Sequence, residues 1–170
     1  AGGTIDLTDN AFVLDYTGAS PLNTIAAQVR LGYDGGAWDG TGFRSSTAAI
    51  DSSLGIGFAE VSETLGENGG TFLGQTVDGT AILLRTTLRG DATIDGIVDF
   101  NDLVKLAQSY NSTSGSLGWA QGDFNYDGTV DFADLVALAQ NYNSGLPSAP
   151  AGLSADFSSI ISQFKDAEVE

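Results

Sequence analysis

Short stretches of apolar and β-branched residues in the first half of the chain predict strands. They lie at residues 4–16, 56–61 and 71–77, with glycine-rich turns between them. The run at 80–88, TAILLRTTL, is mostly apolar or β-branched, as expected of a buried strand. The dipeptide Asp78-Gly79 separates the last two stretches and favours a hairpin that pairs them.

One helix is predicted among these strands. Between Pro21 and Leu31, four apolar residues recur at helical spacing, and Ser20 is a suitable N-cap: Leu22, Ile25, Ala26 and Val29. The glycine-rich stretch 32–42 that follows contains Tyr33 and Trp38, which either cap one end of the sheet or form an aromatic platform for a sugar or a neighbouring subunit.

The second half has a helical period instead. Two segments carry apolar residues at i, i+3, i+4, i+7 and i+10: Phe100, Leu103, Val104, Ala107 and Tyr110 in one, Phe132, Leu135, Val136, Ala139 and Tyr142 in the other. We expect these faces to pack on each other as an antiparallel pair with local two-fold symmetry. Leu117 and Trp119, in the connection between the two segments, are expected to seal the pair.

A fourth helix is predicted near the C-terminus. Pro147 and Pro150 bound a stiff linker, and a short amphipathic stripe follows, capped by Ser154: Phe157, Ile160, Ile161 and Phe164. This helix either docks onto its own chain or inserts into a groove of a neighbour. The predicted fold class is therefore α+β: a β-rich domain at 1–89, an all-α pair of loop-helix units at 90–143, and a linker with a helix at 144–170.

The two helical segments belong to an internal repeat. GDATIDGIVDFNDLVKLAQSYN begins at Gly90 and GDFNYDGTVDFADLVALAQNYN begins at Gly122, 32 residues later. Each copy places oxygen-bearing side chains at alternate positions, a glycine at position 6 and a final aspartate at position 12, which is the pattern of an EF-hand type calcium loop. An acidic turn that caps a helix is the alternative, but matching register in two copies favours calcium.

The sequence thus predicts two calcium ions. The candidate ligands are Asp91, Thr93, Asp95, the Ile97 carbonyl, Asp99 and Asp102 in the first loop, and Asp123, Asn125, Asp127, the Thr129 carbonyl, Asp131 and Asp134 in the second. A threonine at the third position makes the first loop the weaker donor set. Aspartate at position 12 is shorter than the usual glutamate, so a large sensor-like opening is not expected.

Composition narrows the functional classes. A formal charge of −16 repels nucleic acid backbones, and the chain has no apolar run long enough to span a membrane. It contains no Cys, His or Met, which excludes zinc, thiol and imidazole chemistry and leaves calcium as a structural staple. A start at Ala1 indicates processing, and we expect a secreted, extracellular or cell-surface protein, where calcium is abundant.

The duplicated D-x-N/T-x-D-G-x-V-D-F-x-D-L-V-x-L-A-Q-x-Y-N segments resemble a type I dockerin module over Gly90 to Asn143. The resemblance implies two calcium loops, each followed by a helix, and binding to cohesin modules. Where dockerins often have a polar pair such as Ser-Thr at the contact positions, this chain has Phe100-Asn101 and Phe132-Ala133. The order of a strand-rich segment, a calcium repeat and a linker also resembles exported surface proteins of planctomycete-type bacteria.

These observations favour a non-enzymatic, calcium-stabilised structural protein that assembles with its own kind into a layer, matrix or fibre. The alternative is an adaptor whose dockerin-like half binds a cohesin-like receptor while the β half binds carbohydrate through Trp38, Tyr33 or Phe43. A glycosidase using two of Glu60, Glu63 and Glu67 is the least favoured class, because these residues lie in a polar stretch expected to form a solvated turn.

Overall fold

The computed structural model describes residues 2–112 and 117–147. Its strands are β1 (Thr4–Asp6), β2 (Ala11–Asp15), β3 (Gly42–Arg44), β4 (Leu54–Glu60), β5 (Gly70–Phe72), β6 (Gln75–Val77) and β7 (Ala81–Leu88). Its helices are α1 (Leu22–Tyr33), α2 (Ser46–Ile50), α3 (Val61–Thr64), α4 (Phe100–Ser109) and α5 (Phe132–Asn141), with 3₁₀ turns η1 (Asp34–Gly36) and η2 (Trp119–Gln121).

The core is built around one three-stranded antiparallel sheet. Its strand order is β2-β7-β4, so β7 lies between two partners and every one of its residues is buried. This confirms the buried strand expected from TAILLRTTL. The register aligns Phe12 and Phe58 with Leu84 on either side of it, which concentrates large apolar side chains at the centre.

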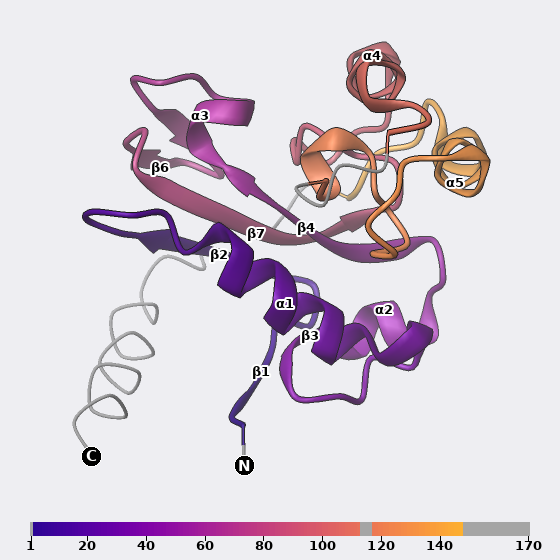
Figure 1. The fold of residues 1–170 in the computed structure, drawn as a ribbon, viewed down its shortest axis with the longest axis horizontal. Helices are drawn as coiled ribbons and strands as arrows, with labels where there is room; N and C mark the ends of the chain where they lie inside the picture. The colour runs from indigo at the N-terminus through magenta and orange to yellow at the C-terminus, as the bar shows by residue number, and fades with distance from the viewer. Residues whose placement is uncertain (1, 113–116, 148–170) are drawn as a thin grey trace.

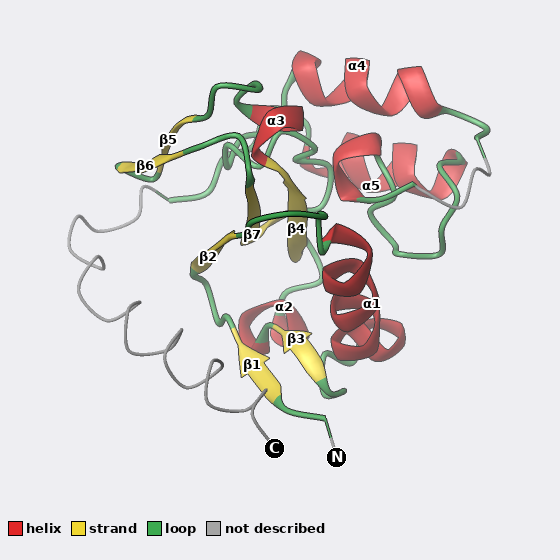
Figure 2. Cartoon of the chain, turned by 60° about the vertical axis from the view of Figure 1, so that its left-hand side comes forward, coloured by secondary structure: helices red, strands yellow, loops and turns green. Residues whose placement is uncertain are grey.

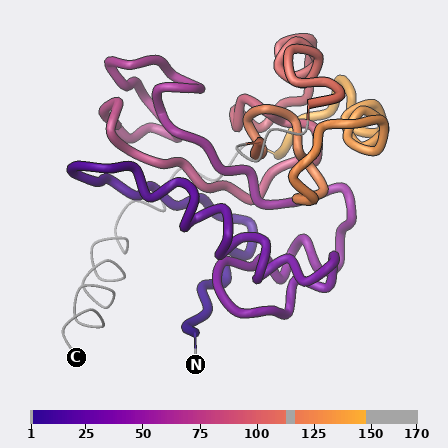
Figure 3. The backbone as a smooth tube through the Cα atoms, in the orientation of Figure 1, coloured from indigo at the N-terminus to yellow at the C-terminus, as the bar shows by residue number. Residues whose placement is uncertain are grey.

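Two smaller sheets flank the central one. Strands β1 and β3 pair in parallel beside α1, and β5 and β6 form a separate antiparallel hairpin. Helix α1 begins where the Ser20 hydroxyl accepts the backbone N–H of Leu22 at 3.0 Å, and it buries Ile25 and Val29. The helix expected near residues 21–31 is therefore confirmed. The described residues of the segment 90–147 gather at one end of the central sheet (Figures 1 and 3).

The hairpin predicted at Asp78-Gly79 is wrong. Strand β6 pairs with β5, while β7 pairs with β2 and β4. Asp78 instead makes a local turn in which its carboxylate accepts the N–H and the hydroxyl of Thr80, both at 2.9 Å. The dipeptide does form a turn, but distant apolar partners determine which strand lies beside β7.

The predicted fold class is also wrong. Within the described residues the first half carries three helices instead of one, and its strands form three separate sheets. The segment 90–143 is not an all-α pair, because it includes the 3₁₀ turn η2 and the antiparallel bridge Ser112–Val130, and Ile97 forms a second antiparallel bridge with Gly145. The sequence pattern marked the helices but not the backbone pairing between the loops, which depends on contacts far apart in the chain. The fold is mixed throughout.

Tyr33 and Trp38 do not form an exposed platform. Trp38 and Phe43 are buried, and the Trp38 ring packs edge-on against Tyr33 with centroids 5.2 Å apart. Both rings also contact Tyr126 of the second acidic loop. The aromatic residues therefore cap the core, and a sugar ring has no access to Trp38 or Phe43.

The helix predicted around residues 154–165 lies outside the described residues. Among the residues that are described, no helix combines the length and the apolar character needed to cross a lipid bilayer. The proposed domain boundaries at 89 and 143 stay a prediction.

Candidate metal centre and docking residues

The two acidic loops have the same backbone. Four pairs of residues 32 positions apart adopt positive φ: Gly90 and Gly122, Ile94 and Tyr126, Gly96 and Gly128, Asn111 and Asn143. A positive φ is unusual for a bulky residue, and above all for β-branched Ile94 at 61°. Because both loops adopt the same uncommon conformation, their shared sequence specifies one loop structure.

Each loop is held by the end of the other unit's helix. Val98 of the first loop donates its N–H to Ser144 at 2.9 Å and accepts from Asn143 at 2.8 Å. Val130 of the second loop accepts from Asn111 at 2.8 Å and donates to Ser112 at 3.3 Å. This reciprocal pairing joins the two copies, and α4 and α5 lie side by side (Figure 2).

The first and last carboxylates of each loop are fully buried. Asp91, Asp102, Asp123 and Asp134 have no more than 1% of their surface exposed. Asp91 accepts the N–H groups of Asp95 at 3.1 Å and Gly96 at 2.9 Å, as well as the Thr87 hydroxyl. Asp123 repeats the same two backbone contacts with Asp127 and Gly128, at 3.1 and 2.9 Å.

Burial makes these carboxylates hard to ionise. Desolvation raises the pKa of Asp91 to about 7, although hydrogen bonds from Thr87 and Gly96 oppose the shift. Burial likewise raises the pKa of Asp123 to about 6. The pKa values of Asp102 and Asp134 are raised for the same reason. Paired buried acids of this kind need a positive partner, and a hard divalent cation supplies one.

The other predicted ligands line the outer side of the loops. Asp95 and Asp127 are exposed, and Thr93 donates its hydroxyl to both Asp91 and Asp102, at 3.4 and 3.1 Å. Asn125 donates to Asp127 at 3.0 Å. Asp99 and Asp131 cap α4 and α5, because each carboxylate accepts the backbone N–H of the residue two positions on. The chain turns at Ile97 and Thr129. Their N–H groups donate to the carboxylates of Asp95 and Asp127, both at 2.8 Å.

The oxygen donors fit calcium in number and type, but their side chains do not converge on one common point. In the described ranges, no group of three or more Asp, Glu, His or Cys side chains is close enough to hold a metal ion. Mutual repulsion among four carboxylates in each loop opposes such a cluster without a cation. Calcium binding therefore stays a proposal, supported by the donor chemistry and by the buried acids.

Most of the predicted packing face of the helices is exposed. Both Phe100 and Phe132 have about two thirds of their surface exposed, 65% and 67%. The matched pairs are also exposed to nearly equal extents: Val104 and Val136 have 36% and 37% of their surface exposed, and Tyr110 and Tyr142 have 39% and 38%. We call these six residues the docking residues. Leu103 and Leu135 of the predicted stripe are partly buried against the core, next to the fully buried Leu106 and Leu138, which the prediction omitted. The prediction was therefore right for one position of each stripe and wrong for the positions that face solvent.

Several residues connect the loops to the first half. From the sequence, a sealing role was expected only for Trp119, and Tyr126, Arg30 and Arg85 were missed. Trp119 is fully buried and donates its indole N–H to the Asp91 carbonyl at 2.6 Å. Tyr126, Arg30 and Arg85 also bridge the halves. Of the three missed residues, only Arg85 had a signal in the sequence, because a lone charge inside the apolar run 80–88 must find a polar partner.

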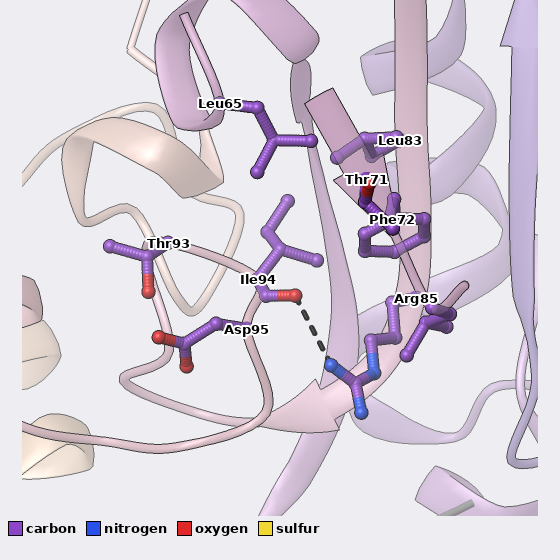
Figure 4. A pocket seen from close by; sticks show the side chains of 9 residues that line it. Leu65, Thr71, Phe72, Leu83, Arg85, Thr93, Ile94 and Asp95 are labelled. Carbon is purple, nitrogen blue, oxygen red and sulfur yellow. Dashed lines mark hydrogen bonds between the residues drawn. The ribbon is translucent and has the colours of Figure 1, made fainter. Parts of the chain in front are cut away.

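A cavity of about 150 Å³ lies between the β5–β6 hairpin, β7 and the first loop (Figure 4). Leu65, Phe72 and Leu83 form its apolar wall, and Arg85 donates to the Ile94 carbonyl at 3.2 Å on the loop side. Its walls are mainly apolar, and we assign it no reactive centre.

The comparisons with known proteins concern the repeat region. No protein-family model matches the chain, and no curated protein matches it. A solved structure described as the type II cohesin-dockerin domain from Bacteroides cellolosolvens is similar at 31% identity, over 34% of this chain and 88% of that one, with a TM-score of 0.29. The likeness is weak and dockerin-like. It is to a type II module, whereas the sequence motifs resemble type I, and it does not bear on the planctomycete-type context.

Proposed function

We propose that residues 90–147 form a docking module that binds another protein through the docking residues, with calcium holding the two loops in place. The observation that carries this proposal is the matched exposure of the apolar pairs. Amphipathic helices normally turn their apolar stripe inward. Here both copies turn the same three apolar positions to solvent, at nearly equal exposure. Exposed phenylalanines at equivalent positions are typical of a binding surface.

The partner favoured is a separate cohesin-type module. A chain with a formal charge of −16 repels its own copies, and two bound calcium ions would reduce the charge only to about −12. A receptor with apolar pockets and a basic rim would match the acidic module in charge. Self-assembly into a layer or fibre is the competing outcome that the experiment decides.

Within this proposal the protein is secreted and non-catalytic. Extracellular calcium at millimolar levels would fill loops of moderate affinity, so the ions act as permanent staples. Asp91, Asp102, Asp123 and Asp134 would bind the ions at the buried side of each loop, and the remaining donors would close the outer side. Bound calcium supplies the positive charge that the buried carboxylates lack.

The docking role is tested by measuring, with calorimetry, the binding of the chain to a panel of type I and type II cohesin modules. Each measurement is made once in calcium and once in EDTA. We expect one or more cohesins to bind in calcium, and Phe100→Ser/Phe132→Ser to weaken binding at least about tenfold, since each exposed anchor contributes on the order of 1–2 kcal/mol. Ile50→Ser is the matched control, because Ile50 is an exposed apolar residue outside the module. Light scattering on the free chain, showing calcium-dependent polymers and no cohesin binding, would favour self-assembly instead.

A further inference from the structure

Each loop has an arginine from the first half of the chain placed against it in the same way. Arg30 of α1 donates Nε–H to the carbonyl of Tyr126 at 3.0 Å, and Arg85 of β7 donates to the carbonyl of Ile94 at 3.2 Å. Tyr126 and Ile94 are equivalent residues of the repeat, although a helix and a strand supply the two arginines.

The two guanidinium groups also lie over equivalent glycines. A Cβ atom added at Gly96 would approach Arg85 Nη2 to 2.7 Å, and one added at Gly128 would have Arg30 Nη2 as its nearest neighbour at 3.7 Å. The first half is not duplicated, so this agreement reflects a requirement of the loops themselves. Each acidic loop thus has an arginine on the side that faces the rest of the molecule, and Arg89 adds a second positive charge at the second loop by donating to the Phe124 carbonyl at 3.1 and 3.2 Å.

Only the second loop has this charge paired directly with a predicted calcium ligand. Arg30 Nη2 lies 3.5 Å from Oδ2 of Asp123, which is buried, while the Arg30 side chain is 42% exposed. In the first loop, Asp91 accepts the neutral Thr87 hydroxyl instead, and the charge of Arg85 acts on Asp91 and Asp95 from further away. The first carboxylate of each loop therefore has a different partner.

We propose that Arg30 is an internal counter-cation of the second loop, which stabilises Asp123 in the calcium-free protein and ties α1 to the loop. This inference rests on the calcium binding proposed above. A guanidinium that compensates a ligand carboxylate stabilises the ion-free state more than the ion-bound state, because in the bound state the ion supplies the compensation and the two cations repel. Arg30 is a positioning residue that lowers the calcium affinity of the second loop and preserves its structure without the ion.

Calcium titration of the full chain with NMR detection of the Gly96 and Gly128 amides tests this inference, since each glycine belongs to one loop. Arg30→Gln is expected to tighten binding at the second loop by roughly five- to tenfold and to leave the first loop within about twofold. Arg30→Lys retains the charge and should bind calcium as the wild type does. Arg44→Gln removes the same charge from β3, where Arg44 pairs with Asp6, and should change neither loop.

Thermal unfolding supplies the second measurement. Arg30→Gln should lower the Tm in EDTA more than in saturating calcium, because the ion replaces the missing charge. Unchanged or weaker calcium binding at Gly128 in Arg30→Gln, with equal losses of Tm in both conditions, would overturn the inference and show a purely structural contact. A wild-type chain that binds no calcium would instead overturn the proposed function together with the inference, so the two failures are distinguishable.

Discussion

The hydroxyl of Tyr126 forms both of the backbone hydrogen bonds that a neighbouring strand would form with Ile56. It accepts the N–H of Ile56 at 2.8 Å and donates to the carbonyl of the same residue at 3.1 Å. Ile56 belongs to β4, and among the described strands β7 is the one that pairs with it. A residue of the second acidic loop thus satisfies two backbone groups at a sheet edge, where unpaired groups are open to association.

Tyr126→Phe removes this connection while retaining the ring. We expect a loss of about 1–3 kcal/mol in the free energy of unfolding, because a buried N–H and a buried C=O lose their partner. Chemical denaturation of the calcium-bound protein measures it. Tyr142→Phe is the control, since Tyr142 is an exposed docking residue, and it should change stability by less than about 0.5 kcal/mol. Equal stability of both variants would contradict the role given to Tyr126.

Local features were predictable from the sequence. The repeat register, the buried strand at 80–88 and the helix after Ser20 follow from periodicity and capping chemistry, which operate over a few residues. The loop conformation repeats because the residues at its turns repeat. These elements needed no knowledge of distant parts of the chain.

Contacts between distant segments were not predictable. The helices contain two apolar stripes, one through Phe100 and Val104 and another through Leu106, and the sequence does not say which of them has a partner. The buried stripe is decided by a distant partner, because the 3₁₀ turn η2 packs against both α4 and strand β4 of the central sheet. The Tyr126–Ile56 contact spans 70 residues and has no sequence signal.

Removal of calcium should destabilise the whole molecule. A ligand at 100 times its Kd adds about 2.7 kcal/mol per site, and for a chain of this size each kcal/mol corresponds to about 2–4 °C in Tm. We therefore expect EDTA to lower the Tm by on the order of 10 °C or more when both loops are filled. Differential scanning calorimetry with calcium and with EDTA measures this. An identical Tm in both would show that the loops fold without an ion, and magnesium in place of calcium is the control for ionic strength.

The calcium-free protein should become less stable as the pH rises from 5 to 7.5. The folded pKa values of Asp91 and Asp123, about 7 and about 6, lie above the value near 4 of an unfolded aspartate. Between those limits the folded state binds more protons than the unfolded state, so deprotonation favours unfolding. Asp6, Asp51 and Asp127 have lowered pKa values and act in the opposite direction, but chiefly below pH 4.

Tm measurements in EDTA at pH 5 and pH 7.5 test this dependence. Asp91→Asn and Asp123→Asn should each flatten the profile, because each removes one buried titrating group. In saturating calcium the trend reverses, since the ion binds ionised carboxylates and its stabilisation falls as they are protonated. A calcium-free Tm that rises towards pH 7.5 would mean that these carboxylates are ionised without an ion in the loops.

Calcium stoichiometry tests the central claim most directly. Calorimetric titration of the full chain should give two ions per molecule, and the matched variants Asp102→Asn and Asp134→Asn should each give one, because each removes the buried last carboxylate of a single loop. Folding of each variant is checked by circular dichroism in calcium. Two ions in the wild type and one in each variant are the predicted result; no bound calcium, or two ions in either variant, would contradict the claim that the repeated loops are a paired calcium site.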